Sequence, residues 1–255
     1  MKAHKPISVY VVTHKTYQFP NLDMYLPLHV GCKGKLDLGY IGDDTGDNIS
    51  NKNAEFCELT GLYWVWKNAA ESSDYVGFSH YRRYFQGREY EFKGKKILTE
   101  SEILKTFEFC DIILPVKRKY VIENVYDHYK NAHHEDDILK TRKVIASLHP
   151  EYLAAFDTVM RGKSLYLCNM FVMKQALFKE YMSWFFSILN ELEGIIDTST
   201  YDSFQGRVFG FLGERLFNVW VEQSTLSKKE IKVVNLEGER YLKKTLGVIR
   251  RKFKV

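Results

Sequence analysis

The sequence predicts an α/β fold with a doubly wound, mainly parallel sheet flanked by helices. Short apolar runs typical of buried strands recur along the 255 residues, and segments of helical periodicity separate them. This alternation is typical of parallel strands joined by helical crossovers. No Pro-, Gly- or Ser-rich linker divides the chain. We therefore expect one domain over residues 1–239, followed by a basic amphipathic tail at 240–255.

The strand predictions rest on runs of β-branched and aromatic residues. Buried strands are expected at residues 7–12, 74–78, 110–115 and 165–173, and shorter ones at 38–41 and 231–236. Residues 16–36 contain Pro20, Pro27, Gly31 and Gly34, which predict irregular structure. Residues 86–98 predict a surface hairpin or loop.

The helix predictions rest on apolar residues spaced three or four apart. Helices are expected at residues 54–70, 99–107, 121–160 (divided at Pro150), 176–192 and 202–222. Asn53 is a candidate N-cap for the first helix, and Thr99 with Glu102 forms a capping box at the second.

The net charge of +5 is unevenly distributed. Seven Lys and Arg residues and no acid lie within residues 240–255, where Leu242, Leu246, Ile249 and Phe253 recur on one helical face. Such a tail suits an anionic membrane surface, although a terminal helix packed on the body explains the pattern equally well. The body carries no second basic stripe, which argues against nucleic acid as a partner.

The compartment expected from the sequence is the cytoplasm. The four cysteines lack metal-ligand spacing and suit reduced thiols, and the N-terminus has no signal-peptide pattern. No apolar run approaches the roughly 20 residues that span a bilayer. With the basic tail, these features predict a cytoplasmic protein, peripheral at most at the inner face of the membrane.

The sharpest local feature is the segment Ser79-His80-Tyr81-Arg82-Arg83, which directly follows an apolar strand. Guanidinium groups pair bidentately with phosphate oxygens, and fixed positive charge stabilises a departing diphosphate. Ser79, His80, Arg82 and Arg83 are therefore candidate substrate contacts. A structural salt bridge near a strand end is the alternative.

Two further polar segments follow strands. Thr13, His14 and Lys15 stand at the end of the first strand, the end at which open α/β sheets bind ligands. A dense acidic turn offers possible acceptors for ribose hydroxyls or a base N–H, through Asp43, Asp44, Asp47 and Asn48. A plain polar loop and a surface turn are the respective alternatives, and a Ca²⁺ site is disfavoured because the EF-hand spacing is absent.

Later segments supply the remaining candidates. His133 and His134 lack clean zinc-ligand spacing, so we interpret them as hydrogen-bonding groups for phosphate or sugar, with an exposed polar helix as the alternative. Glu214 and Asp202 are candidate general bases, because an apolar setting around Glu214 would raise its pKa. Alternatively Glu214 pairs with Arg215 or with Arg207, itself a candidate substrate contact.

Taken together and in order, these motifs resemble a bacterial family of capsular and exopolysaccharide glycosyltransferases, long labelled a domain of unknown function. The resemblance covers roughly residues 7–238 and is carried by 13–15, 43–50, 57–68, 80–84, 113–115, 128–134, 169–171 and 210–216. It adds Asn169, within the 169–171 motif, to the candidate substrate contacts.

The resemblance implies a GT-A-like fold, a nucleotide-sugar donor such as a UDP-sugar, and a lipid-linked glycan acceptor. Some members resemble galactofuranosyltransferases, which makes UDP-galactofuranose the first donor to consider. Many GT-A enzymes have an Asp-x-Asp metal motif after the strand that here spans residues 74–78. This chain has His80-Tyr81-Arg82 there, which puts a requirement for Mn²⁺ or Mg²⁺ in doubt.

The working hypothesis is an inverting hexosyltransferase. Thr13, His14 and the 43–48 turn would hold the nucleoside, His80 and the two arginines would neutralise the diphosphate, and Glu214 would deprotonate the acceptor. The alternatives are a nucleotide-sugar hydrolase or phosphotransferase, and a non-catalytic glycan- or partner-binding subunit of a polysaccharide synthesis complex.

Overall fold

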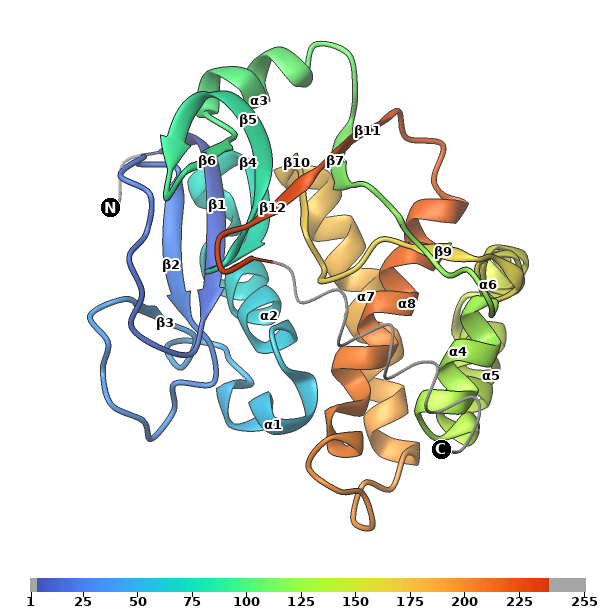
Figure 1. Ribbon diagram of the computed structural model, residues 1–255. Helices are drawn as coiled ribbons and strands as arrows, with labels where there is room; N and C mark the ends of the chain where they lie inside the picture. Colours follow the sequence, from blue (N-terminus) through green and yellow to red (C-terminus); the bar gives the residue numbers. More distant parts are fainter. Residues whose placement is uncertain (1–3, 239–255) are drawn as a thin grey trace.

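The computed structural model describes residues 4–238, and the predicted C-terminal tail at 240–255 lies outside them. The described chain forms a mixed α/β domain around a ten-stranded sheet (Figure 1). The strands are β1 (Lys5–Thr13), β2 (Tyr25–His29), β3 (Ile41–Gly42), β4 (Ser73–His80), β5 (Arg83–Phe92), β6 (Lys95–Ile97), β7 (Ile112–Pro115), β8 (Arg118–Lys119), β9 (Ser164–Leu165), β10 (Phe171–Lys174), β11 (Lys228–Ile231) and β12 (Val233–Asn235).

The predicted mainly parallel sheet is confirmed. Its main path runs β11-β7-β10-β4-β1-β2-β3, while β5, β6 and β12 branch from β4 and β8 pairs only with β9. Along the path every neighbouring pair is parallel except the two that involve β10, which is antiparallel to both β4 and β7. The parallel pairing of β1 with β4 places Val12 beside His80, so both strands end at the same edge.

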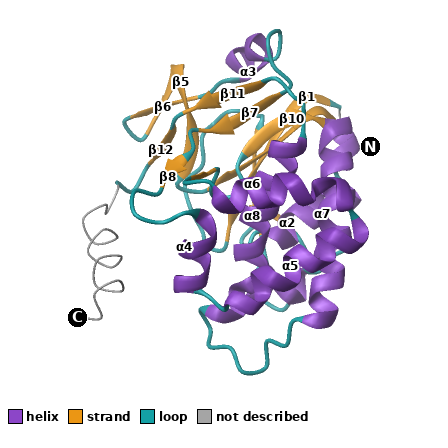
Figure 2. Cartoon of the chain, turned by 90° about the vertical axis from the view of Figure 1, so that its right-hand side faces the viewer, coloured by secondary structure: helices purple, strands orange, loops and turns teal. Residues whose placement is uncertain are grey.

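Helices cover the sheet mainly from one side (Figure 2). They are α1 (Asn53–Phe56), α2 (Leu59–Asn68), α3 (Glu100–Thr106), α4 (Val125–Ala132), α5 (Glu135–Leu148), α6 (Leu153–Arg161), α7 (Gln175–Ile195) and α8 (Val208–Gln223). Short 3₁₀ turns lie at Ser50–Lys52, Ala70–Ser72, Pro150–Tyr152 and Gln205–Arg207. The capping box predicted at Thr99 is present at the start of α3.

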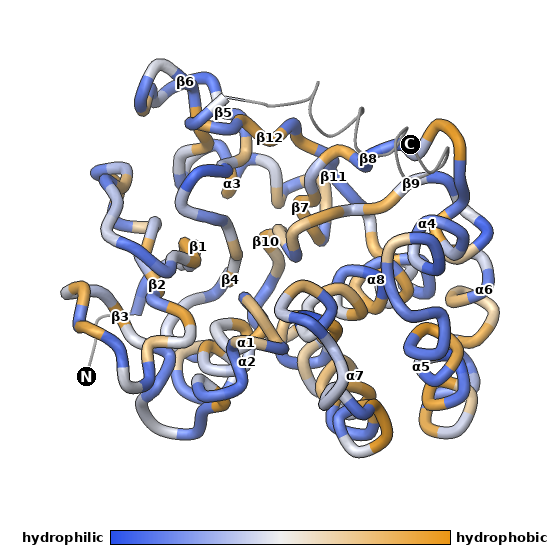
Figure 3. The backbone as a smooth tube through the Cα atoms, turned by 60° about the horizontal axis from the view of Figure 1, so that its bottom comes forward, coloured by the Kyte–Doolittle hydropathy of each residue, from blue (hydrophilic) through white to orange (hydrophobic). Residues whose placement is uncertain are grey.

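Alternation along the central strands divides the core into two clusters. Tyr10 and Val12 of β1 pack into the cluster under α2, α7 and α8, whereas Val9 and Val11 face the cluster closed by β5, β6 and α3. Successive strand side chains point to opposite faces, so one strand supplies both layers. Figure 3 shows hydrophobic residues concentrated in the central strands and alternating with hydrophilic ones along the helices.

The prediction of irregular structure for residues 16–36 is wrong at β2, which lies beside β1 in the sheet. Pro27 sits within this strand, opposite Val11. Proline is tolerated in a strand where its missing N–H has no partner to satisfy. The outer neighbour β3 pairs only with Leu28 and His29, so that side of Pro27 is open.

Three predicted elements are interrupted near one another. The expected helix at 54–70 is broken between α1 and α2 at Cys57, which has φ 53°. The expected strand at 165–173 splits into β9 and β10, with Cys168 at φ 70° and Asn169 at φ 46° between them. The helix expected from residue 202 begins at Val208 instead.

Non-glycine residues adopt such left-handed conformations rarely and at a cost, and they tend to occur at functional sites.

No helix within residues 4–238 is long and apolar enough to cross a membrane.

Candidate active site

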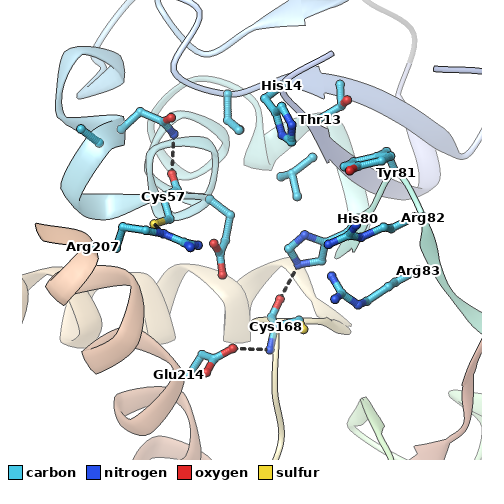
Figure 4. A pocket seen from close by; sticks show the side chains of 15 residues that line it. Thr13, His14, Cys57, His80, Tyr81, Arg82, Arg83, Cys168, Arg207 and Glu214 are labelled. Carbon is cyan, nitrogen blue, oxygen red and sulfur yellow. Dashed lines mark hydrogen bonds between the residues drawn. The ribbon is translucent and has the colours of Figure 1, made fainter. Parts of the chain in front are cut away.

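A cavity of about 430 Å³ opens at the edge where β1 and β4 end (Figure 4). Its size falls within the range of small-molecule sites. Residues from six parts of the chain line it: Val12, Thr13, His14, Val30, Asn53, Ala54, Cys57, Glu58, His80, Tyr81, Arg82, Arg83, Cys168, Arg207 and Glu214. Seven of the residues predicted from the sequence therefore meet in one cavity: Thr13, His14, His80, Arg82, Arg83, Arg207 and Glu214.

The end of β1 turns sharply and brings His14 to the cavity. The buried Thr13 hydroxyl donates to the Lys15 carbonyl at 2.7 Å and accepts from the Lys15 N–H at 3.2 Å. This local turn orients the His14 ring edge-on to Tyr81, with ring centroids 5.6 Å apart. Burial, followed by the charges of Lys15 and Arg82, lowers the pKa of His14.

His80 is held in one protonation state. Its Nε2 lies 2.7 Å from the Cys168 carbonyl oxygen, which can only accept, so His80 donates from Nε2 and keeps Nδ1 as an acceptor. Burial lowers the pKa of His80 to about 4. In this cavity His80 is therefore a neutral hydrogen-bonding group at neutral pH, and its predicted part in neutralising a diphosphate stays a prediction.

Three arginines supply the positive charge of the cavity. Arg82 and Arg83 lie in the reversal from β4 to β5, where His80 pairs with Arg83 and the buried Ser79 hydroxyl donates to the Arg83 carbonyl. Arg207 reaches the cavity from the other side, ahead of α8 (Figure 4). Neither Arg83 nor Arg207 forms a salt bridge within residues 4–238.

The charge of Arg82 is partly engaged. Its Nη1 lies 3.4 Å from the Glu237 carboxylate, and Lys15 lies 3.8 Å from the other oxygen of the same carboxylate. Lys15 also sits 4.8 Å above the Tyr81 ring and does not line the cavity. The three charged side chains are all more than a third exposed, so water screens their attraction.

Two carboxylates face the arginines. Glu214 of α8 accepts from the Cys168 N–H at 2.8 Å and lies 3.5 Å from Arg215, with 22% of its side chain exposed. Burial raises its pKa, although Arg215 acts in the opposite direction. Glu58, between α1 and α2, accepts from the Asn169 side-chain amide at 2.9 Å, and burial raises its pKa as well.

The left-handed turn at Cys168 links the two sides of the cavity. Its carbonyl accepts from His80 while its N–H donates to Glu214, as the dashed lines in Figure 4 show. The next residue, Asn169, is 1% exposed and binds Glu58. Asn169 thus supports a wall of the cavity from behind and does not line it.

The acidic turn at 43–48 lies outside the cavity and supports the fold. Asp43 is fully buried, and its carboxylate accepts from the N–H groups of Gly31 and Cys32 and from the hydroxyls of Ser50 and Thr60. Every oxygen is occupied, so the structure gives Asp43 no lone pair to offer a ribose.

The rest of this turn is engaged in local contacts. Asp47 accepts from the Tyr63 hydroxyl at 2.9 Å, and Asn48 donates to the carbonyls of Asp44 and Gly46. Asp44 is exposed on the same turn. None of these side chains reaches the cavity.

The predicted residues of the late chain also gather elsewhere. The Asp202 carboxylate accepts from the N–H groups of Phe204 and Gln205, which makes it a turn cap. His133 lies 3.1 Å from the Gln205 side-chain oxygen and 4.0 Å from the Phe211 ring centroid, and His134 stacks on Tyr201. All three lie outside the cavity, so Glu214 is the candidate base that the geometry retains.

Sequence reasoning missed Glu58 and Cys57, although both belong to the motif that carried the family resemblance. Cys57 accepts from the Arg207 Nε at 3.2 Å, and a Cβ at Gly210 would stand 2.9 Å from its sulfur. The absence of a side chain at Gly210 thus lets α8 approach Cys57 closely. Glu58 and Cys57 reach the cavity because the helix breaks between α1 and α2, and neither Gly nor Pro marks this break in the sequence.

No metal-binding cluster is apparent in the described part of the chain. Between His4 and Gly238, no three His, Cys, Asp or Glu side chains are grouped so that they could hold a metal ion. Arginine side chains occupy the cavity wall beyond β4, and guanidinium groups bind phosphate directly.

Comparison with known proteins identifies a family and one solved structure. The family model described as "Domain of unknown function (DUF4422)" matches residues 8–225. The apo structure of WbbM, a bifunctional glycosyltransferase, is similar to this chain with a TM-score of 0.84 and 36% sequence identity, over 92% of this chain and 46% of the WbbM chain. This chain thus spans about half the length of WbbM. No curated protein matches it.

These findings confirm the family resemblance inferred from the ordered motifs and the mainly parallel α/β fold. The family match spans the ends of β1 and β4, the α1–α2 break and α8, and so includes every element that lines the cavity. The chain belongs to the family described as domain of unknown function DUF4422.

Proposed function

We propose that this chain is a glycosyltransferase that moves a hexose from a UDP-sugar to a growing, lipid-linked capsular or exopolysaccharide, with inversion. The observation that carries the proposal is one cavity lined by Arg82, Arg83 and Arg207 together with the half-buried carboxylates Glu58 and Glu214. The similarity to a glycosyltransferase, WbbM, supports the same reaction class. UDP-galactofuranose is the first donor to test.

The arginines act on the donor. As the bond between the sugar and the diphosphate breaks, negative charge develops on the leaving oxygen, and fixed guanidinium groups stabilise that charge. Neutral His80 contributes a hydrogen-bond acceptor at Nδ1, which suits a ribose or sugar hydroxyl better than a phosphate oxygen. Thr13 and His14 border the same side of the cavity.

Glu214 acts on the acceptor. In its charged form it takes the proton of an acceptor hydroxyl, the hydroxyl oxygen bonds to the anomeric carbon, and the diphosphate leaves with the electron pair of the broken bond. A raised pKa makes Glu214 a stronger base than an exposed glutamate. The charge of Glu58 also raises the pKa of Glu214.

Transfer of labelled sugar from UDP-galactofuranose, UDP-galactose and UDP-glucose to a lipid-linked acceptor tests the proposal. We expect Arg83→Ala to weaken donor binding and Glu214→Gln to lower turnover by at least about 100-fold with the donor Kd retained. Arg88→Ala, an exposed arginine outside the cavity, is the matched control for charge. Asp202→Asn is the control for the rival base and should keep near-native turnover. Native rates in Arg83→Ala and Glu214→Gln would refute the assignment.

The same assay separates the alternatives. A hydrolase would release UDP at the same rate with and without acceptor, whereas a transferase requires the acceptor. A non-catalytic subunit would bind ligand without turnover.

Metal independence is a second part of the proposal. Three arginines line the cavity and can balance the charge of a diphosphate without a metal, so we expect EDTA to leave the initial rate unchanged and Mn²⁺ to add no more than about twofold. Loss of activity in EDTA, with recovery on adding Mn²⁺, would contradict it.

A further inference from the structure

The connection from β7 to α4 (residues 116–122) exposes an unusual number of aliphatic side chains. Val121 is 89% exposed, Ile122 52% and Val116 49%. Single exposed apolar residues are common on soluble proteins and need no explanation. Three within seven residues form a local apolar surface, and such surfaces mark sites of interaction.

Basic residues lie within the same segment as these aliphatic side chains. Lys117, Arg118 and Lys119 lie between them, and Lys163 is adjacent because its carbonyl accepts from the Tyr120 N–H at 2.7 Å. Among the residues from 4 to 238, none of these four cations forms a salt bridge. Residues 116–122 with Lys163 are called the basic-aliphatic patch below.

The patch is held in place by the fold. Arg118 and Lys119 form β8, which pairs with β9, and Lys117 lies 4.7 Å above the ring centroid of Tyr166. Figure 2 shows β8 directly above α4. The segment that carries the aliphatic side chains is therefore anchored at its centre by the pairing of β8 with β9.

We propose that the basic-aliphatic patch is the surface by which this protein rests on an anionic lipid membrane. Unpaired cations complement anionic headgroups, and aliphatic side chains between them can enter the boundary between headgroups and acyl chains. A protein partner would bury an apolar centre with a polar rim, whereas here three consecutive cations, Lys117 to Lys119, separate Val116 from Val121 and Ile122. A run of cations flanked by exposed aliphatic side chains favours an anionic lipid surface.

The patch approaches Glu214 through Tyr120, although no residue of the patch lines the cavity. Tyr120, within the patch, packs against His128 in a tilted arrangement, with ring centroids 4.4 Å apart. Burial raises the pKa of Tyr120, and Arg215 and Glu214 lie close enough to alter it further. An acceptor whose lipid carrier stays in the membrane would thus reach Glu214 from this side. This last step rests on the proposed transferase function.

Cosedimentation of the full chain with vesicles tests the patch. The vesicles contain equal parts of phosphatidylglycerol and phosphatidylcholine, and phosphatidylcholine vesicles provide the neutral reference. Each cation near such a surface contributes about fivefold in partitioning, so Arg118→Gln with Lys119→Gln should lower binding about 25-fold. Val121→Ser with Ile122→Ser should lower it about tenfold.

Two matched controls lie elsewhere on the surface. Phe109→Ser removes one large side chain that is 81% exposed, and Lys95→Gln with Lys96→Gln removes two exposed cations from β6. Both should bind vesicles within about twofold of the unaltered chain, since neither touches the patch. Residues 239–255 remain in every variant, so any binding through the tail is common to all.

Equal binding of both patch variants and the unaltered chain would overturn the proposal. So would vesicle binding that persists while Val121→Ser with Ile122→Ser abolishes self-association in analytical ultracentrifugation, because the patch would then join two copies. The proposed function fails separately. If patch variants lose vesicle binding but no nucleotide sugar is ever turned over, the membrane surface stands and the transferase assignment falls.

Discussion

Replacing His80 with glutamine tests whether burial holds this ring neutral. The Gln Nε2 can still donate to the Cys168 carbonyl, but glutamine cannot take up a proton. In the folded chain the pKa of His80 is about 4, whereas an unfolded histidine titrates near 6.5. The folded state thus binds this proton less tightly than the unfolded state. The stabilising effect is complete above about pH 6.5 and is lost as the pH falls toward 4.

The size of the effect follows from the two pKa values. Between about pH 7.5 and about pH 4.5, linkage gives a loss of roughly 2.5 kcal/mol in the free energy of unfolding from His80 alone. Because His80 retains some exposure in the cavity, water screens part of the penalty, and we expect about 1 to 2.5 kcal/mol. The glutamine variant lacks this loss.

Urea unfolding of both proteins at the two pH values measures the difference. His14 and His29 also have pKa values lowered by burial, but they are present in both proteins and cancel in the comparison. Parallel loss of stability in the two proteins would refute the reasoning, as would an NMR titration of the His80 ring near pH 6.5. His80→Gln should also keep its affinity for UDP at neutral pH, because no charge is removed.

Three further predictions concern single positions. Glu214→Gln should keep or raise the free energy of unfolding at neutral pH. Burial raises the pKa of Glu214, so its carboxylate lowers stability as the pH rises through that pKa, and glutamine lacks this charge. Clear destabilisation of the variant in a urea titration would count against this prediction. Asp43→Ala should cost about 2 to 4 kcal/mol in unfolding while leaving the UDP Kd unchanged, since it strands buried donors far from substrate. Cys57→Gly should match the free energy of unfolding of the unaltered chain or exceed it by up to about 1 kcal/mol, because φ at this position is 53° and glycine adopts such a conformation without strain. Cys57→Val should lower the free energy of unfolding. The reverse order of the two variants in thermal unfolding would exclude strain at this residue.

Much of the fold could be predicted because the strongest patterns are local. The apolar runs of β1, β4 and β7 and the long periodicity of α7 are set by burial along a single element. The strand β2 could not be predicted in this way, because Pro27 argues against a strand unless its neighbours are known. Whether Pro27 lies opposite a residue of β3 depends on where β3 begins, which only the tertiary structure shows.

Site residues could likewise be predicted where the pattern is local and not where it depends on the tertiary structure. Thr13, His14 and the residues from His80 to Arg83 were predicted because they follow strands whose ends must meet. Glu58 reaches the cavity only because a helix breaks at Cys57, and no local pattern predicts that break. The acidic turn at 43–48 was predicted to bind ligand but lies outside the cavity, for a related reason. Buried backbone N–H groups must find acceptors, and Asp43 serves them before any ligand.

The two peptide groups that flank Cys168 act on opposite sides of the cavity through their directions. The carbonyl of the 168–169 peptide selects the tautomer of His80, and the N–H of the 167–168 peptide favours the charged form of Glu214. Turning both peptide groups over would point the Leu167 carbonyl at Glu214 and the Asn169 N–H at His80, and so would invert both preferences. The protonation states of His80 and Glu214 therefore depend together on the backbone conformation at Cys168, where φ is 70°.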